Sequence, residues 1–366
     1  MNRILRMGTA GAIVALIVPL GAAPAQADDD SSPRFTQVNQ VSDDPAQHPN
    51  VVDTNVVNAW GLALSSGSPI WVANNGTDTA TLYPGGLGGA PVAKSPFTVV
   101  LPKDSAPTGQ VFNTATGQFM VTGTKDDGTT ASGSAVFIFD GEGGDVIGWS
   151  PTITRTRAFV AAHVDGAVYK GLALWQTPFG PLLLAADFAN GRIDVFDRTF
   201  QRLTLPHQFF NDPRLPKGYA PFNVMVSGDT VYVAYAKQQA GSTDEQAGPG
   251  LGFVDAYTDL GLTVRRIASH GALNAPWGLA IAPAGFGKLT GALLVGNFGD
   301  GRISAYRGDD FVGQLRGADG HRIVIDGLWA LQPGTTVSGG TATLWFSAGP
   351  NEESHGLLGQ LIPATH

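Results

Sequence analysis

Three oxygen-bearing side chains occupy the same position in repeated segments of the chain. Asn74, Asp187 and Asn297 each follow a short apolar run that has the composition of a buried strand. Carboxylate and amide oxygens are the ligands that Ca²⁺ prefers, with about six to eight in a full shell. The three residues are therefore candidate calcium ligands, if the runs direct them to one axis. The alternative is structural, because Asn and Asp after a strand often cap the turn by bonding to nearby backbone.

Two histidines are the candidates for acid–base chemistry. His355 shares a loop with Glu353, and His163 stands close to Asp165. A positioned imidazole can transfer a proton near neutral pH, so either could be the acid or base of a hydrolase or lyase with Asp187 on the metal. The alternative for both is a solvated loop. No two of the seven histidines have metal-ligand spacing and the chain has no Cys, which argues against a zinc site made from local sequence.

Aromatic residues open several of the repeated segments. Trp60, Trp277 and Trp329 stand near the start of apolar strands, where a ring could stack on a sugar or a peptide. The alternative is that they pack between neighbouring repeats. The chain has neither a Gly-x-Ser-x-Gly nucleophile motif nor a phosphate-binding P-loop.

The segments that must position these residues form six copies of one repeat. The spacing between copies runs from 48 residues (61 to 109) to 62 residues (109 to 171). Short strands that recur at about this period are typical of a β-propeller. We therefore predict an all-β fold, a six-bladed β-propeller. The six first strands align on Gly61, Gly109, Gly171, Asn223, Gly278 and Trp329.

The second and third strands of each blade are apolar runs without clear alternation, as expected for strands buried on both faces. The sixth copy ends after its third strand, while the strand-like segment 35–41 has no partner. We expect 35–41 to supply the outer strand of the last blade and so close the ring; the alternative is a stray N-terminal strand. Second strands are expected at 70–73, 119–122, 182–185, 231–234, 293–296 and 344–347, and third strands at 79–83, 135–140, 191–196, 252–257, 301–306 and 356–361.

Two of the repeats carry a recognisable signature. Asp187-x-x-Asn190-x-Arg192-Ile193 and Asn297-x-x-Asp300-x-Arg302-Ile303 resemble NHL-type propeller repeats. The whole chain resembles an uncharacterised family of secreted bacterial six-bladed propellers. NHL-type relatives include binding scaffolds, sensor domains, lactonase-like hydrolases and amidating lyases. The resemblance to the lactonase-like group implies one central metal held by Asn, Asp and Glu side chains.

The first 27 residues have the features of a Sec-type signal peptide. Arg3 and Arg6 precede an apolar stretch at 10–20, and Ala25-Gln26-Ala27 provides the small residues of a cleavage site after Ala27. The apolar stretch is too short to span a membrane. We expect a secreted, extracellular protein with an N-terminal segment at 28–50 and the propeller at 51–366.

The composition limits the partners. A net charge of −8 argues against bulk electrostatic binding of nucleic acid or an anionic membrane. Because the chain has no Cys, its core must provide the stability without disulfides. We expect a monomer without a membrane span.

The preferred functional hypothesis is an extracellular binding platform for a small polar ligand, glycan or peptide at the mouth of the central channel. Its expected ligand-binding residues are Trp60, Asn74, Asp187, Trp277, Asn297 and Trp329. The alternative is an extracellular calcium-dependent hydrolase or lyase of lactonase-like type that uses the same mouth.

Overall fold

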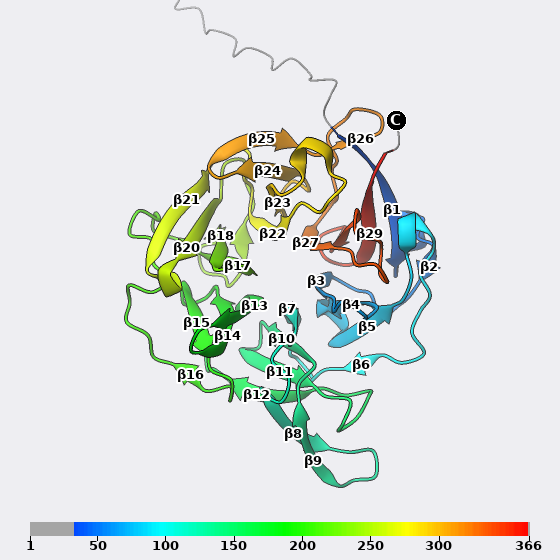
Figure 1. Cartoon of the computed structure of the whole chain (residues 1–366), viewed down its shortest axis with the longest axis vertical. Helices are drawn as coiled ribbons and strands as arrows, with labels where there is room; N and C mark the ends of the chain where they lie inside the picture. The colour runs from blue at the N-terminus through cyan, green and yellow to red at the C-terminus, as the bar shows by residue number, and fades with distance from the viewer. Residues whose placement is uncertain (1–32, 365–366) are drawn as a thin grey trace, which may run out of the picture. The chain divides into compact units, whose positions relative to one another are not determined.

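The computed structural model describes residues 33–364, which fall within one compact unit, Pro33–His366. Six antiparallel sheets surround a common centre (Figure 1). The first strand of each sheet lies innermost and contacts the innermost strands of both neighbouring sheets, so the contacts close into a ring. The unit is therefore a six-bladed β-propeller. The innermost strands are β3 (Ala59–Ala63), β7 (Pro107–Phe112), β13 (Tyr169–Thr177), β17 (Tyr219–Ser227), β22 (Pro276–Ile281) and β27 (Leu328–Pro333).

The outer strands follow in chain order within each of the first five blades. Blade one adds β4 (Ile70–Asn74), β5 (Thr79–Tyr83) and β6 (Val99–Val100); blade two adds β10 (Phe137–Gly141), β11 (Asp145–Trp149) and β12 (Phe159–His163). Blade three adds β14 (Gly180–Asp187), β15 (Arg192–Phe196) and β16 (Arg202–Leu203); blade four adds β18 (Thr230–Gln238), β20 (Phe253–Thr258) and β21 (Thr263–Ser269), with the short β19 (Glu245–Gln246) on β18. Blade five adds β23 (Leu293–Asn297), β24 (Ile303–Arg307) and β25 (Asp310–Gln314).

Blade six combines the two ends of the described chain. Its strands β28 (Leu344–Ala348) and β29 (Leu357–Pro363) are followed in the sheet by β1 (Arg34–Ser42), which contains the segment 35–41. β1 runs antiparallel to β29, from the pair Phe35 and Pro363 to the pair Ser42 and Leu357, with a bulge between Asn39 and Val41. The short strands β2 (Val51–Val52) and β26 (Arg316–Gly317) both pair with β1.

The prediction for the strands of blade two was wrong. The segment 119–122 lies in a separate hairpin, β8 (Met120–Thr124) and β9 (Thr130–Ser134), which projects from the ring (Figure 1). The segment 135–140 supplies the second strand, β10, and not the third. The hairpin has the local pattern of a blade strand, because Phe119 and Val121 are buried. It packs closely on β12: a Cβ at Gly123 would lie 2.4 Å from the Phe159 ring. This insertion also explains the long spacing from Gly109 to Gly171.

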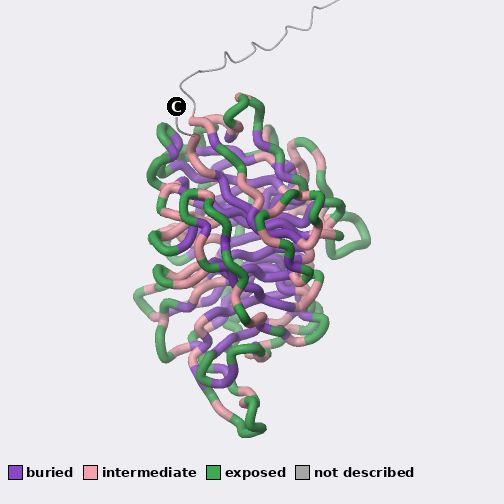
Figure 2. The backbone as a smooth tube through the Cα atoms, turned by 90° about the vertical axis from the view of Figure 1, so that its right-hand side faces the viewer, coloured by how far each residue is buried: buried purple, intermediate pink, exposed green. Residues whose placement is uncertain are grey.

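Burial between neighbouring blades explains why the strands lack an alternating pattern. β3, β4 and β5 are buried along their whole length, because both faces of blade one contact another blade. Figure 2 shows the buried strands stacked through the interior, with exposed backbone confined to the loops and outer edges. Glycine permits the close approach of the innermost strands: a Cβ on Gly61 would lie 2.3 Å from the carbonyl oxygen of Thr108 in the next blade.

Candidate functional site

A β-bulge interrupts every innermost strand at the same place. In each blade, the ladder to the second strand skips one residue, or two consecutive residues, near the start of the innermost strand, and we call the first skipped residue the bulged residue. A bulge redirects the side chain of the extra residue, and bulges are enriched next to functional sites. Five of the six bulged residues are large, and one of these is a cation. The bulged residues are Trp60, Thr108, Lys170, Phe222, Trp277 and Trp329.

The four aromatic bulged residues meet across the centre of the ring. Trp60 of blade one stacks on Trp329 of blade six with ring centroids 3.6 Å apart, and it meets Trp277 of blade five edge-on with ring centroids 6.3 Å apart. Phe222 of blade four lies 5.9 Å from Trp329, although their blades are not adjacent. All four side chains are buried. We call Trp60, Phe222, Trp277 and Trp329 the aromatic plug, because they fill the channel at this level.

Polar side chains of the even-numbered blades hold the inner strands in register with the next blade. Thr108 Oγ1 donates to the carbonyl of Tyr169, and Asn223 Nδ2 donates to the carbonyl of Trp277 at 2.8 Å. Ser347 Oγ donates to the carbonyl of Trp60. These bonds fix the backbone of three bulges.

Lys170 is the one cation among the bulged residues. Its side chain is only 3% exposed, and its Nζ lies 2.7 Å from Oε1 of Glu142 and 5.2 Å from the centroid of the Trp60 ring. Burial alone would lower the pKa of the ammonium, but the charges of Glu142 and Glu245 more than offset that effect and raise the pKa. Lys170 therefore stays protonated.

Four carboxylates surround Lys170 and come from loops of the even-numbered blades. Glu142 follows β10 in blade two, Asp244 and Glu245 lie at the start of β19 in blade four, and Glu353 lies between β28 and β29 in blade six. Asp244 and Glu245 each approach Lys170 Nζ to 3.7 Å. We call these four residues the carboxylate rim. Lys170 forms ion pairs with Glu142, Asp244 and Glu245, and its charge also lowers the proton affinity of Glu353.

Two asparagines join the rim to the aromatic plug. Asn58 Nδ2 donates to Glu353 Oε2 at 2.6 Å, and Asn58 Oδ1 accepts from the indole nitrogen of Trp329 at 2.9 Å. Asn75 Nδ2 donates to Glu142 Oε2 at 3.0 Å. Trp329 thereby positions a carboxylate at the mouth through one intervening side chain.

Burial sets the proton affinity of the rim. It raises the pKa of Glu245 to about 7, although the charge of Lys170 acts in the opposite direction. Burial also raises the pKa of Glu353, against the hydrogen bond from Asn58. Glu245 Oε2 is buried without a hydrogen-bond donor. The mouth therefore contains one carboxyl group, that of Glu245, that can exchange a proton near neutral pH.

The loop that carries Glu353 has an unusual backbone. Asn351, Glu352 and Glu353 have φ values of 56°, 54° and 64°, three left-handed residues in succession without a glycine. Such residues cost free energy and persist only where the surroundings hold them, commonly at functional sites. The strain fits a loop that is shaped to place Glu353 at the mouth.

The structure brings together Trp60, Trp277 and Trp329, but not as free stacking surfaces. Trp329 is held between Trp60 and Phe298, whose ring centroid is 4.0 Å away. Trp60 faces Lys170 on its other side, and Trp277 Nε1 donates to the carbonyl of Lys170. These contacts are the ones expected if the three tryptophans pack between neighbouring blades.

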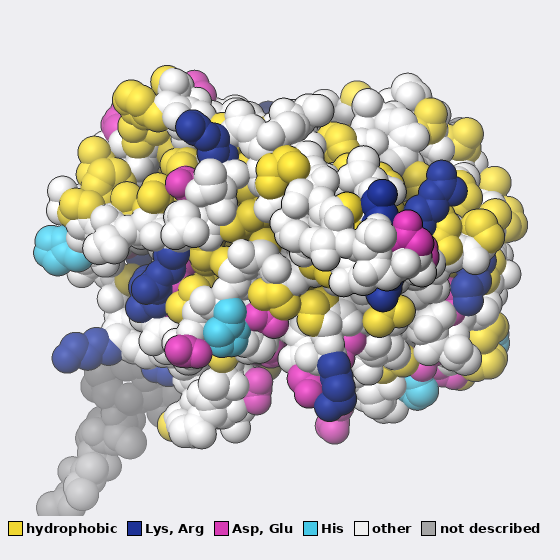
Figure 3. Space-filling view, turned by 90° about the horizontal axis from the view of Figure 1, so that it is seen from below, with side chains coloured by type: hydrophobic (Ala, Val, Ile, Leu, Met, Phe, Trp, Pro, Cys, Tyr) yellow, Lys and Arg dark blue, Asp and Glu magenta, His cyan; other side chains and the backbone are white. Residues whose placement is uncertain are grey.

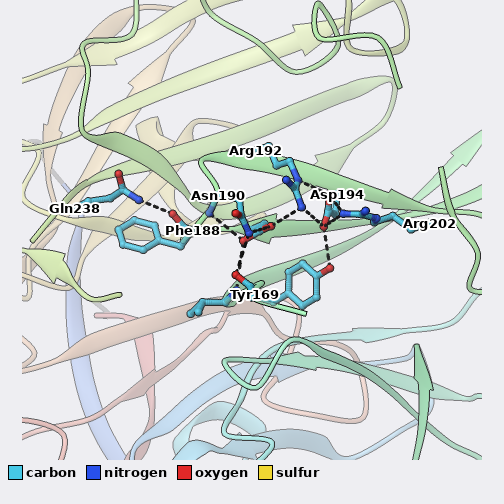
Figure 4. A network of polar contacts seen from close by, with 10 residues as sticks. Tyr169, Phe188, Asn190, Arg192, Asp194, Arg202 and Gln238 are labelled. Carbon is cyan, nitrogen blue, oxygen red and sulfur yellow. Dashed lines mark hydrogen bonds and ion pairs between the residues drawn. The ribbon is translucent and has the colours of Figure 1, made fainter. Parts of the chain in front are cut away.

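Asp187 is engaged within blade three by Asn190 and Arg192, two members of the polar network that Figure 4 shows. It accepts a hydrogen bond from Asn190 Nδ2 at 2.8 Å and from the amide of Val168, and it pairs with Arg192 at 3.1 Å. Arg192 also binds Asp194, which accepts from the Tyr169 hydroxyl. Burial raises the pKa of Asp187, and the bonds from Asn190 oppose this effect. The carboxylate therefore already has a cation and local donors.

Asn74 and Asn297 are likewise turned toward their own blades. Asn74 Nδ2 donates to the hydroxyls of Thr79 and Thr81, and Asn297 Nδ2 donates to the carbonyl of Ala272 and to Asp300. Their amide oxygens are buried without a donor. The partners of Asp187 leave it poorly suited to a shared ion, so these three residues do not fit one calcium site. Within residues 33–364, no group of three or more His, Cys, Asp or Glu side chains is arranged to hold a metal.

The two histidines lie in different settings. His163 is on the outermost strand of blade two, where its ring nitrogens lie 2.8 Å from Asp145 and 3.1 Å from Asp165. His355 Nδ1 lies 2.8 Å from Asp43, next to the end of β1. Hydrogen bonds from the rings to the carboxylates of Asp145 and Asp43 raise the pKa of the His163 and His355 imidazoles. Neither ring contacts Lys170 or the carboxylate rim, although the backbone of His355 bonds to Asn58.

Sequence reasoning missed Lys170, Glu142 and Asn58. A signal for Lys170 was present: Tyr169-Lys170-Gly171-Leu172 matches Ala59-Trp60-Gly61-Leu62 with a cation in place of the indole. A charged residue inside a buried repeat position needs a partner. Glu142 and Asn58 have no comparable local signal.

Acidic side chains are also distributed unevenly over the outer surface. Figure 3 views the side of the propeller from which the β8–β9 hairpin projects, and Asp and Glu gather toward the lower rim of that view.

Within residues 33–364 there is no helix long and apolar enough to cross a membrane.

Comparison with known proteins finds relatives by sequence and others by fold alone. No family model matches it. Among solved structures, a streptogramin B lyase has a TM-score of 0.49 at 11% identity and covers 90% of this chain and 97% of its own. A virginiamycin B lyase from Staphylococcus aureus has a TM-score of 0.48 at 11% identity and covers 90% and 99%. Likenesses at this level concern the fold and carry no argument about activity.

Two relatives are much closer in sequence. The uncharacterized protein R648 of Acanthamoeba polyphaga mimivirus is 34% identical over 322 residues, which are 84% of this chain and 76% of that protein. The uncharacterized protein L690 of the same virus is 32% identical over 323 residues, 85% of this chain and 81% of that protein. The chain belongs to the propeller family that contains these two viral proteins.

Proposed function

We propose that this propeller is a secreted binding protein that holds a cationic group, an amine of a small molecule or a basic side chain of a peptide, at the carboxylate rim. The observation that carries the proposal is the charge balance of the mouth. Glu142, Asp244, Glu245 and Glu353 face one buried cation, Lys170. Even with Glu245 protonated, the mouth keeps an excess of negative charge.

The surroundings of the rim favour a cationic ligand over a sugar. The indoles of the aromatic plug are buried against each other, so they offer no open ring to a sugar. Asp244 is well exposed, whereas Glu245 is buried, so the rim reaches from solvent to the plug. A ligand ammonium at the rim would donate charge-assisted hydrogen bonds to carboxylates that outnumber the one buried cation.

The test compares matched ligands on the full propeller. N-acetyl-lysine methylamide should bind by calorimetry, and the uncharged N-acetyl-norleucine methylamide, which lacks the ammonium group, should not. Asp244→Asn and Glu353→Gln should each weaken binding about tenfold, and added salt should weaken it further. Asp309→Asn, an exposed change in the β24–β25 turn, is the control and should have no effect. Equal binding of the neutral analogue, or no binding of either, would refute the proposal.

A second candidate is a hydrolase or lyase that works at the same mouth. The observation in its favour is Glu245, a buried carboxyl with a pKa raised to about 7 beside Lys170, because a general acid or base works best near the ambient pH. Calcium content measured by mass spectrometry, with thermal melts in calcium and in chelator, addresses a metal-dependent version. About one calcium per chain and a lower melting temperature after chelation would support it. Lactone and ester turnover that Glu245→Gln abolishes would favour catalysis over binding.

A further inference from the structure

A cavity of about 280 Å³ lies in the channel on the other side of the aromatic plug. It is lined by the second halves of all six innermost strands, and Trp277 separates it from Lys170, to whose carbonyl the indole donates. None of the residues that line the cavity is charged. It therefore differs in chemistry from the carboxylate rim at the opposite end.

One tier of the cavity contains a single polar residue. The tier is formed by the residue two positions after each bulged residue: Leu62, Gln110, Leu172, Val224, Leu279 and Leu331. The ladder registers confirm that these positions correspond, because Leu62 pairs with Val72 and Gln110 with Phe139 at the same distance from the bulge. Five blades place an aliphatic side chain here. Blade two places a carboxamide.

The carboxamide of Gln110 has no hydrogen-bond partner. Both its nitrogen and its oxygen are buried and unpaired, and the residue is 6% exposed. An unpaired buried amide is destabilising, since it loses its bonds to water without replacing them. Leucine, the residue of four of the other five blades, would avoid this cost. The other buried amide of the lining, Asn223, is satisfied by the Trp277 carbonyl and the Val224 amide.

We propose that this cavity is a second binding site, separate from the rim, for a small uncharged molecule that bears an amide, lactam or imide group. A carboxamide can donate and accept at once, so the cis amide edge of a lactam would match both unpaired atoms of Gln110 after a rotation of the side chain that turns its amide into the cavity. The aliphatic tier contacts the apolar body of the ligand, and the absence of charged lining residues disfavours an ion. Gln110 occupies this position because it binds a ligand, although its unpaired amide lowers the stability of the fold.

The test replaces Gln110 with the type of aliphatic residue that the other blades place at this position. Gln110→Leu should fold and melt at or above the temperature of the unmodified protein, because it removes an unpaired polar group. δ-Valerolactam should bind the unmodified protein in ligand-observed NMR and should bind Gln110→Leu at least tenfold more weakly. Cyclohexanone, which has the same ring size but no N–H, should bind both proteins weakly and equally. Gln110→Met, which keeps the length of the side chain, replaces the Leu variant if that fails to fold.

Each outcome decides the proposal. If valerolactam and cyclohexanone bind the unmodified protein equally, or if Gln110→Leu binds valerolactam as well as the unmodified protein does, Gln110 does not recognise the ligand and the proposal is wrong. If neither compound binds, the cavity holds water only and the proposal is also wrong. Binding of N-acetyl-lysine methylamide at the rim is independent of all these results.

Discussion

Lys170 and Glu142 join blade three to blade two at the mouth of the channel, with 2.7 Å between Nζ and Oε1. Lys170 is at a bulge position where four of the other five blades place an aromatic ring, and it is almost as buried as those rings. Glu142 is 27% exposed and also accepts from Asn75. The pair therefore anchors a charge network at the edge of an apolar plug.

Removing the cation should be strongly destabilising. Lys170→Met is expected to lower the free energy of unfolding by about 3–5 kcal/mol, because it leaves the carboxylate rim without its counter-charge. Urea unfolding at pH 8 measures the loss. Adding Glu142→Gln to Lys170→Met should recover part of it, which gives a coupling free energy of about 1 kcal/mol or more in a double-mutant cycle. Strictly additive effects would show that the two residues do not interact.

The strands were largely predictable, but the contacts between blades were not. The third strand of blade one was predicted at 79–83, and β5 has these bounds. Short apolar runs between turn residues are local signals. The segment 119–122 has the same local signal and belongs to an inserted hairpin, since only pairing distinguishes the two.

The candidate site depends on features that local patterns do not encode. Trp329 was aligned with Gly61 of blade one, whereas Leu331 pairs after the bulge as Leu62 does, so Ala330 corresponds to Gly61 and Trp329 is the bulged residue. A one-residue shift of this kind decides which side chain enters the channel. Lys170 meets Glu142 through a bulge in one blade and a loop in another, so their contact follows from the closed ring and not from either segment.

Glu245 should make stability depend on pH. Its pKa in the folded protein is about 7, whereas glutamate in an unfolded chain titrates near 4.3. Between these values the folded protein holds a proton that the unfolded chain has lost, so the free energy of unfolding should fall as pH rises from about 4.5 to 7. One such group contributes a slope of up to about 1.36 kcal/mol per pH unit.

Denaturant unfolding of Glu245→Gln across this pH range should show a shallower slope than the unmodified protein. Asp140, whose pKa burial also raises to about 7, should contribute a similar share. When Asp140→Asn is combined with Glu245→Gln, the unfolding free energy should therefore depend on pH even less than in Glu245→Gln alone. An unchanged slope in Glu245→Gln would mean that this carboxyl is ionised in the folded protein well below pH 7.

Asn223 should be important for the register between blades four and five. Asn223→Ala leaves the carbonyl of Trp277 and the amide of Val224 without their side-chain partner in a buried setting. We expect a loss of about 1–3 kcal/mol in unfolding free energy. Asn211→Ala, at an exposed asparagine, is the matched control and should change stability by less than about 0.5 kcal/mol. Similar effects of the two variants would rule out a structural role for the Asn223 bond.

Phe35 tests the contribution of β1 to the ring. The side chain is 1% exposed, its ring centroid lies 4.6 Å from that of Phe286 in blade five, and its strand completes the sheet of blade six. Phe35→Ala should lower the free energy of unfolding by about 3–5 kcal/mol, because it opens a cavity between the last two blades. Phe179→Ala changes a ring that is 83% exposed and should be nearly neutral. If Phe35→Ala were equally neutral in urea unfolding, β1 would be a dispensable addition to blade six and the other strands would hold the ring closed without it.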